Sequence, residues 1–158
     1  KNLIIGGGGH NMAAGFTLEK INLSHFKDFI LDNYSHSTAS RINTFLYDAE
    51  ISSQAFNKNF FNDIKKLEPF GTENPNPTFL FKDLKVIKTK ILNEKHISVI
   101  LKSKTGFSIK SISFNSINNN VGKYLLNYEK TFSVLGQINE NVWNNKKTLQ
   151  LTIQDLVI

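Results

Sequence analysis

The sequence predicts an α/β segment followed by an all-β barrel of about five strands with a short helix. Two observations predict this division. The first half mixes short strand-like runs with apolar residues at helical spacing, whereas residues 79–158 contain five strand-like runs. All three prolines lie within residues 69–77, where they end any helix. We therefore predict a first domain over residues 1–36, a connector with a strand, a helix and a proline-rich hinge over 37–78, and a barrel domain over 79–158.

The chain opens with an apolar run at residues 3–5, four glycines and His10. We expect the run to end a strand, the glycines to form a loop, and residues 11–14 to open a helix. Such a turn offers free N–H groups at the positive end of a helix dipole, which suits a phosphate. His10 would add a side-chain donor or an acid-base group. The spacing fits neither the P-loop nor the dinucleotide-binding fingerprint, and a glycine-rich turn with an incidental histidine stays open.

Two helices are expected before the prolines, one ending at Asn33 and one beginning at Asn57. Short strands are expected at residues 16–19 and 45–48. Both helices carry apolar side chains at spacings of three and four, which is typical of a buried helix face. These side chains are Leu23, Phe26, Ile30 and Tyr34 in the first helix and Phe60, Ile64 and Leu67 in the second.

The runs after the prolines predict the barrel. The strands are expected at residues 79–88, 97–103, 107–115, 131–138 and 149–157, and a helix at 121–128. In the last run Leu149, Leu151 and Ile153 alternate with polar residues, which is the period of a half-buried strand. Five strands with a helix between the third and the fourth form the layout of an OB-fold, a small barrel that often binds single strands or oligosaccharides. A fold does not by itself establish function.

The charge is divided unevenly along the chain. Residues 1–78 hold seven basic and eight acidic residues, a net charge of −1, whereas residues 79–158 hold twelve lysines and five acidic residues, a net charge of +7. A basic half beside a neutral half indicates a polyanionic partner. The heavy use of Lys, Asn, Ile and Phe is typical of an A+T-rich genome, but such a bias does not explain the difference between the halves.

Nucleic-acid contacts are predicted on the barrel. Trp143 lies in a polar stretch between the last two strands, and OB-folds use that loop for oligonucleotides. Trp143 could equally cap the core, and any single lysine is more often a solvated surface residue. Phe107, Phe114 and Phe132 are expected in the core. The candidate phosphate contacts are Lys82, Lys85, Lys88, Lys90, Lys102, Lys104, Lys110, Lys146 and Lys147.

Composition limits the remaining possibilities. The 158 residues contain no cysteine, which excludes disulfides and fits a reducing cytoplasm. No apolar run approaches the length of a membrane span and no signal peptide is visible, so we expect no membrane partner. The chain starts inside a motif, so we expect it to be part of a longer protein.

Two stretches resemble known families. Residues 8–15 resemble the GGHxxAAG signature of DHHA1 domains, which follow a catalytic DHH domain in a phosphoesterase superfamily. Residues 67–79 resemble the LEPFGxGNPxPxF segment that introduces the OB domain of RecJ, a family of bacterial single-stranded-DNA-specific exonucleases, and residues 143–156 resemble the last hairpin of that domain. The order of these motifs favours RecJ. Thr72 and Glu73 depart from the pattern, which commonly has an acidic residue and glycine there.

The resemblance implies a metal-dependent 5′-to-3′ exonuclease of DNA repair and recombination. Its Mn²⁺ or Mg²⁺ ions would be bound by a DHH domain, which the chain would meet in cis. No DHH triplet occurs here and the four histidines lack metal-ligand spacing, so we expect no metal in this chain and no activity from it alone. We expect Gly8 and Gly9 to let the backbone approach the scissile phosphate and His10 to donate to it.

The partners implied are single-stranded DNA and, as a further candidate, single-stranded-DNA-binding protein. Two alternatives stay open. One is a non-catalytic module that binds single-stranded DNA or protein. The other is a different DHH-family phosphoesterase acting on short oligonucleotides or cyclic dinucleotides, which the predicted OB domain disfavours.

Overall fold

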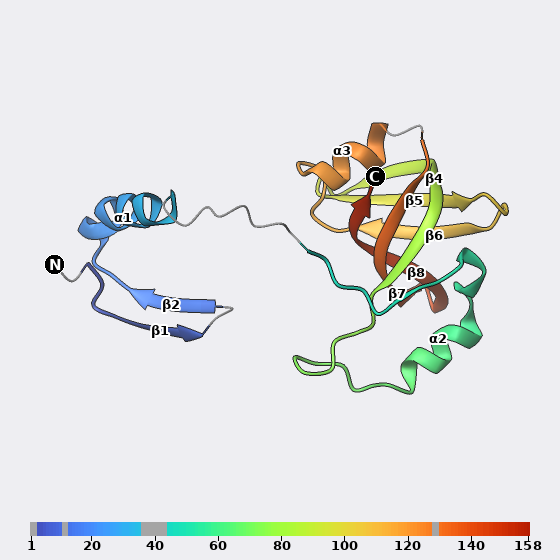
Figure 1. Cartoon of the computed structure of the whole chain (residues 1–158), viewed down its shortest axis with the longest axis horizontal. Coiled ribbons are helices and arrows are strands. Elements are labelled where there is room, and N and C mark those ends of the chain that lie inside the picture. Colours follow the sequence, from blue (N-terminus) through green and yellow to red (C-terminus); the bar gives the residue numbers. More distant parts are fainter. Residues whose placement is uncertain (1–2, 11–12, 36–43, 128–129) are drawn as a thin grey trace. The chain divides into compact units, whose positions relative to one another are not determined.

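The computed structural model describes four stretches of the chain: residues 3–10, 13–35, 44–127 and 130–158. The chain forms two compact units, Lys1–Thr44 and Phe45–Ile158 (Figure 1). The predicted domain boundary at residue 36 lies outside the described residues. None of the helices in the described stretches is long and apolar enough to cross a membrane.

The glycines at the start of the chain form a strand. β1 (Gly6–His10) pairs antiparallel with β2 (Ala13–Thr17) along their whole lengths. The predicted glycine loop is therefore wrong, and so is the predicted helix at its described residues; Asn11 and Met12 lie outside the description. Glycine permits this close pairing, because a Cβ atom at Gly9 would lie 2.7 Å from Cα of Ala14.

α1 (Leu23–Ser35) follows a 3₁₀-helix at Lys20–Asn22 and confirms the first predicted helix. The ring of Phe16 in β2 packs against that of Phe26, with the centroids 4.6 Å apart. No hydrophobic side chain in the described part of this unit is buried, and Ile21 is 80% exposed. The first unit therefore has no hydrophobic core among its described residues.

Five strands of the second unit close into a barrel. They are β4 (Phe79–Leu92), β5 (His96–Ser103), β6 (Ser108–Ser113), β7 (Phe132–Trp143) and β8 (Lys146–Val157). Their order is β4-β5-β6-β8-β7, and β7 pairs with β4 to close the barrel. β6 and β8 are parallel, whereas the other neighbours are antiparallel. With α3 (Asn120–Asn127) between β6 and β7, this layout confirms the predicted OB-fold.

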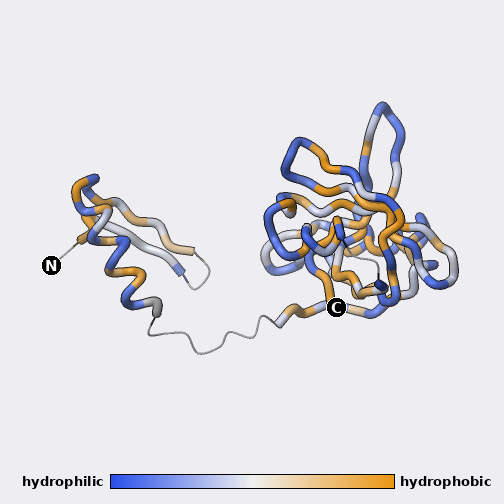
Figure 2. Tube along the Cα trace, turned by 90° about the horizontal axis from the view of Figure 1, so that it is seen from above, coloured by the Kyte–Doolittle hydropathy of each residue, from blue (hydrophilic) through white to orange (hydrophobic). Residues whose placement is uncertain are grey.

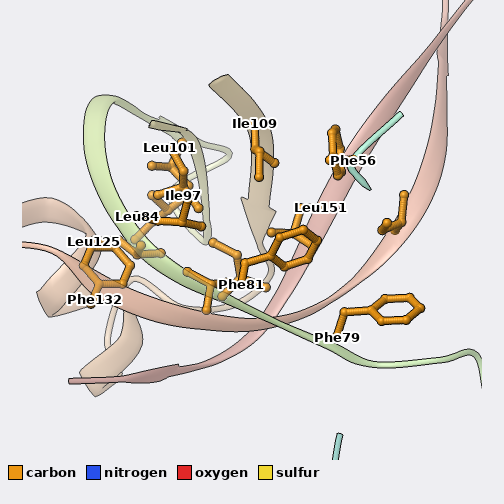
Figure 3. Packing of buried hydrophobic residues seen from close by; sticks show 14 of the residues in the cluster. Phe56, Phe79, Phe81, Leu84, Ile97, Leu101, Ile109, Leu125, Phe132 and Leu151 are labelled. Atoms are coloured by element: carbon orange, nitrogen blue, oxygen red, sulfur yellow. The ribbon is translucent and has the colours of Figure 1, made fainter. Parts of the chain in front are cut away.

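Alternate strand residues fill the barrel, as the period of two requires. Phe81, Ile109 and Leu151 are fully buried and meet in the core from three different strands (Figure 3). Leu125 of α3 joins the same cluster. Hydrophilic residues predominate in the hairpins that project from the barrel (Figure 2). Because strand side chains alternate between the two faces, the residues between the buried ones face outward.

β4 bends within the barrel. Its register shifts between Phe81 and Leu84 and again between Val86 and Lys88. Bulges of this kind bend a strand, and here they let the first part of β4 pair with β7 and the second part with β5. After the second shift Lys88 lies opposite Ile100 of β5.

The described part of the predicted connector packs onto the barrel. β3 (Ala49–Glu50) pairs in parallel with the start of β4, so the short strand begins at residue 49 and not at residue 45. A 3₁₀-helix at Ser53–Ala55 leads on to α2 (Lys58–Lys65). The second unit therefore contains these elements together with the barrel.

α2 begins where the sequence predicts it. The Asn57 side chain caps the helix by accepting from the backbone N–H of Phe60 at 3.0 Å. Phe61 and Ile64 join the barrel core. Leu67 lies beyond the end of the helix and is 56% exposed, so its predicted place in the apolar stripe is wrong.

Side-chain amides fix the proline-rich segment. Asn74 Nδ2 donates to the carbonyl of Leu67 at 2.8 Å and to that of Pro69 at 3.0 Å. Gln137 Nε2 of β7 donates to the carbonyl of Asn76 at 2.8 Å. The segment is thus held both to itself and to β7.

Candidate nucleic-acid interface

Five of the predicted lysines lie on one outer surface of the barrel. Residues directly opposite each other in neighbouring strands have side chains on the same face of the sheet. Lys85 lies opposite Lys102, and Ile100 lies between Lys88 on one side and Lys110 on the other. The residues that alternate with them in β5 and β6 point into the core. We call this surface the basic face; it consists of Lys85, Lys88, Lys90, Lys102 and Lys110.

The other predicted lysines differ in their charge partners. Lys82 binds Glu50 at 2.6 Å, Lys104 binds Asp83 at 2.9 Å, and Lys147 binds Glu140 at 3.2 Å. The hydrogen bond and the charge of Glu50 raise the pKa of Lys82. Within the described stretches no carboxylate forms an ion pair with a lysine of the basic face or with Lys146. Among the described residues, the charge of the basic face is therefore uncompensated.

One pair on the basic face places two like charges opposite each other. Lys85 and Lys102 are cross-strand neighbours, and like charges placed directly opposite destabilise a strand pair. They line a hollow of about 440 Å³ beside the β5–β6 turn, which Lys104 and its carboxylate partner Asp83 also line.

The β7–β8 hairpin carries Trp143. The predicted loop is wrong, because β7 runs to Trp143 and β8 starts at Lys146 directly opposite it. Only Asn144 and Asn145 form the turn, with φ angles of 48° and 59°, the left-handed values that a two-residue hairpin requires and asparagine tolerates. The Trp143 side chain is 74% exposed, so the core-capping alternative is also wrong.

Glu140 joins the hairpin to α2. Its carboxylate binds Nζ of Lys58 in α2 and Nζ of Lys147 in β8. The hydrogen bond from Lys58, followed by that from Lys147, lowers the pKa of Glu140 below its ordinary value. This carboxylate therefore holds two lysines and fixes the side of the hairpin away from Trp143.

The predicted phosphate contacts of the first unit lie at the end of the β1–β2 ladder. His10 is opposite Ala13, and Gly8 is opposite Gly15 on the same face. A Cβ atom at Gly8 would meet nothing within 4 Å, in contrast to one at Gly9. The helix-dipole argument does not apply here, because β2 replaces the expected helix. The roles of Gly8, Gly9 and His10 stay predictions.

Sequence reasoning missed several surface residues. Phe114 was expected in the core but is 53% exposed, and its ring meets that of His96 edge-on with the centroids 5.2 Å apart. Phe132 is buried, as expected. Asn141 and Gln150 line a groove with Trp143. The alternation around Leu149 and Leu151 already predicted that Gln150 faces outward. The local sequence did not show which polar residues of other segments lie beside it in the groove.

The described residues contain no group of three metal-ligating His, Asp or Glu side chains. The chemistry available on the barrel is that of ammonium groups, amides and exposed aromatic rings.

Comparison with known proteins shows a protein family to which most of the chain is similar. The model of the RecJ OB domain matches residues 47–155. The single-stranded-DNA-specific exonuclease RecJ of Bacillus subtilis (strain 168) is 24% identical over 160 residues, which are 96% of this chain and 19% of that protein. The chain thus spans about a fifth of the length of this curated relative.

Two solved structures share the fold. Crystal structures of RecJ from Thermus thermophilus in complex with Mg²⁺ and with Mn²⁺ match with TM-scores of 0.62 and 0.64, each at 22% identity. The matches cover 99% and 98% of this chain and 23% and 22% of the other chains. At this identity the likeness shows the fold alone.

Proposed function

The chain belongs to the RecJ OB domain family, and on that premise we propose that its barrel binds single-stranded DNA through the basic face. The observation that carries the proposal is the set of uncompensated lysines on neighbouring strands β4, β5 and β6. Phosphates would lie against these ammonium groups, and bases would stack on exposed aromatic rings. The OB-fold presents such a surface in many single-strand-binding proteins.

A wider proposal concerns the whole protein. We propose that the chain is the C-terminal part of a RecJ-type 5′-to-3′ exonuclease of DNA repair and recombination in the bacterial cytoplasm. Its first unit would be the end of a DHHA1 domain, with apolar residues covered by the DHH domain in cis. Mn²⁺ or Mg²⁺ held by that domain would activate water. Single-stranded-DNA-binding protein stays a candidate partner.

In this proposal His10 donates to the phosphate that is cleaved, with Gly8 and Gly9 allowing its approach. Replacing His10 by alanine in the full-length enzyme should lower turnover by about 100-fold or more while leaving DNA affinity nearly unchanged. Single-turnover cleavage and equilibrium binding, measured on the same preparation, separate the two effects. Equal losses in both would remove the catalytic role.

Binding to matched oligonucleotides tests the function of the barrel. The chain is titrated with a labelled single strand and with the same sequence as a duplex, at about 50 mM and about 200 mM salt. We expect preference for the single strand and weaker binding at the higher salt, because each phosphate contact releases counterions. Preference for the duplex, or affinity independent of salt, would contradict the proposal.

A further inference from the structure

The second half of β4 has a sheet neighbour on one side only. After the second register shift, residues 88–92 pair with β5. The pairing of β4 with β7 ends at Leu84, and its pairing with β3 covers only Phe79 and Leu80. Within the described stretches no strand pairs with the other edge of residues 88–92. Every second residue of a strand directs its N–H and C=O groups to that side. We call it the β4 edge.

The outer side of the β4 edge is basic. Lys88 lies opposite Ile100 and Lys90 opposite Ser98, so both ammonium groups belong to the basic face. If a second copy of the chain paired through the same edge, lysines would lie beside lysines, and like charges directly opposite destabilise a strand pair. Lysines on an edge protect it against such self-pairing. The charge therefore favours a strand with carboxylates at these positions.

The inner side of the β4 edge is apolar. Ile91 lies directly opposite Ile97, so the two side chains share the core face of the sheet. Ile97 is fully buried, and α3 packs on it, because a Cβ atom at Gly122 would lie 3.1 Å from its Cδ1. Ile91 is nevertheless 46% exposed. A strand added at this edge would cover Ile91 with an apolar side chain and so remove apolar surface from water.

We propose that the β4 edge binds an extended segment of a partner protein as an additional strand, and that acidic and apolar residues alternate in this segment. Its carboxylates lie beside Lys88 and Lys90, and its apolar side chains lie beside Ile91. While it is bound, these two lysines are not available to phosphates, so the segment displaces single-stranded DNA from the basic face. The displacement rests on the function proposed for the barrel, whereas the docking does not.

The probe is a capped synthetic peptide of about six residues, the length of an ordinary strand, in which glutamate and valine alternate. Two further versions are methylated on backbone nitrogens, one at every glutamate and the other at every valine. Only every second residue of an added strand donates its N–H to the edge. One methylated peptide should therefore bind like the parent, and the other should lose binding. Equal binding of the two methylated peptides would overturn strand addition.

Two readouts are taken on the same samples of the chain. Hydrogen exchange of the backbone amides, followed by NMR, should become slower at residues 88–92 when the parent peptide is bound, because the peptide gives these groups hydrogen-bond partners. The fluorescence anisotropy of a labelled single-stranded oligonucleotide should fall as the same peptide is added. The first readout reports docking and the second reports displacement.

Charge reversal tests the choice of partner. The double variant Lys88→Glu, Lys90→Glu should reject the glutamate peptide and bind a matching peptide in which lysine and valine alternate. The double variant Lys65→Glu, Lys66→Glu carries the same change of charge at the end of α2 and should keep the preference for the glutamate peptide. Circular dichroism confirms that both variants are folded. An unchanged preference in the first variant would overturn the assignment of an acidic segment.

The outcomes distinguish the two proposals. Displacement of DNA without slower exchange at residues 88–92 would overturn the β4 edge and leave the basic face standing. Slower exchange without displacement would keep the docking and overturn the role of Lys88 and Lys90 in DNA binding. Exchange that slows with increasing protein concentration, in the absence of peptide, would assign the edge to a second copy of the chain and overturn the acidic partner.

Discussion

At the scale of single residues, the lysines of the barrel fall into two classes that composition cannot separate. Lys82, Lys104 and Lys147 each have a carboxylate partner, whereas the basic face has none in the described part of the chain. The partner of Lys82 is Glu50, which lies in a different strand and far away in the sequence. The compensation of a charge therefore depends on the fold and not on the local pattern.

Glu140 should make the stability of the second unit depend on pH. Its pKa is lowered in the folded state from an ordinary value of 4.5, so its contribution is complete above that value and is lost as pH falls through the lowered pKa. Glu140→Gln should therefore lose stability relative to the parent at neutral pH, and this difference should shrink as the pH falls below 4.5. The stability difference between the two proteins is measured from their denaturant midpoints at about pH 7 and about pH 3, because the ordinary pKa of a glutamate lies between these values. An equal difference at both pH values would contradict the assignment.

At the scale of elements, the barrel strands were predictable and the first strands were not. Strand-like runs identified all five strands of the barrel, and alternation marks the last of them, which buries one face and exposes the other. The glycines of β1 carry no such pattern, and their permissive backbone fits a loop as well as a strand. The resemblance of residues 143–156 already indicated a hairpin, but its length was missed, because Trp143 and its polar neighbours look like a loop until β8 is paired with them.

α2 should contribute to the stability of the barrel. Ile64 is 5% exposed and packs in the core, so Ile64→Ala should lower the free energy of unfolding by about 2–5 kcal/mol. Leu67→Ala is the matched control, since Leu67 is 56% exposed, and we expect a change of about 0.5 kcal/mol or less. Equal effects of the two substitutions in urea unfolding would mean that α2 does not pack as described.

α3 is seated where only glycine fits. A Cβ atom at Gly122 would lie 1.8 Å from the backbone oxygen of Ser116, which cannot move away freely. We expect Gly122→Ala to destabilise the second unit by about 1–3 kcal/mol through overpacking. Gly71→Ala, where a Cβ atom meets nothing within 4 Å, is the control for thermal unfolding. If Gly122→Ala left the unfolding temperature unchanged, α3 would not pack against Ser116 as described.

At the scale of the whole molecule, the two units are built differently. The second has a continuous core that includes α2 and the barrel, whereas the first buries no hydrophobic side chain among its described residues. The motif order already favoured the family to which the chain belongs. The packing of α2 onto the barrel could not be predicted in the same way, because Phe61 and Ile64 find their partners only in the folded barrel.

The central claim is that the uncompensated lysines, and not basic charge in general, bind the DNA strand. Two triple variants carry the same change of charge: Lys85, Lys88 and Lys102 to glutamine, and Lys82, Lys104 and Lys147 to glutamine. The salt dependence of binding to one single-stranded oligonucleotide is measured for each. Loss of three phosphate contacts should reduce the slope of log K against log salt by about 2 in the first variant, and by much less in the second. Equal slopes for the two variants would contradict the claim.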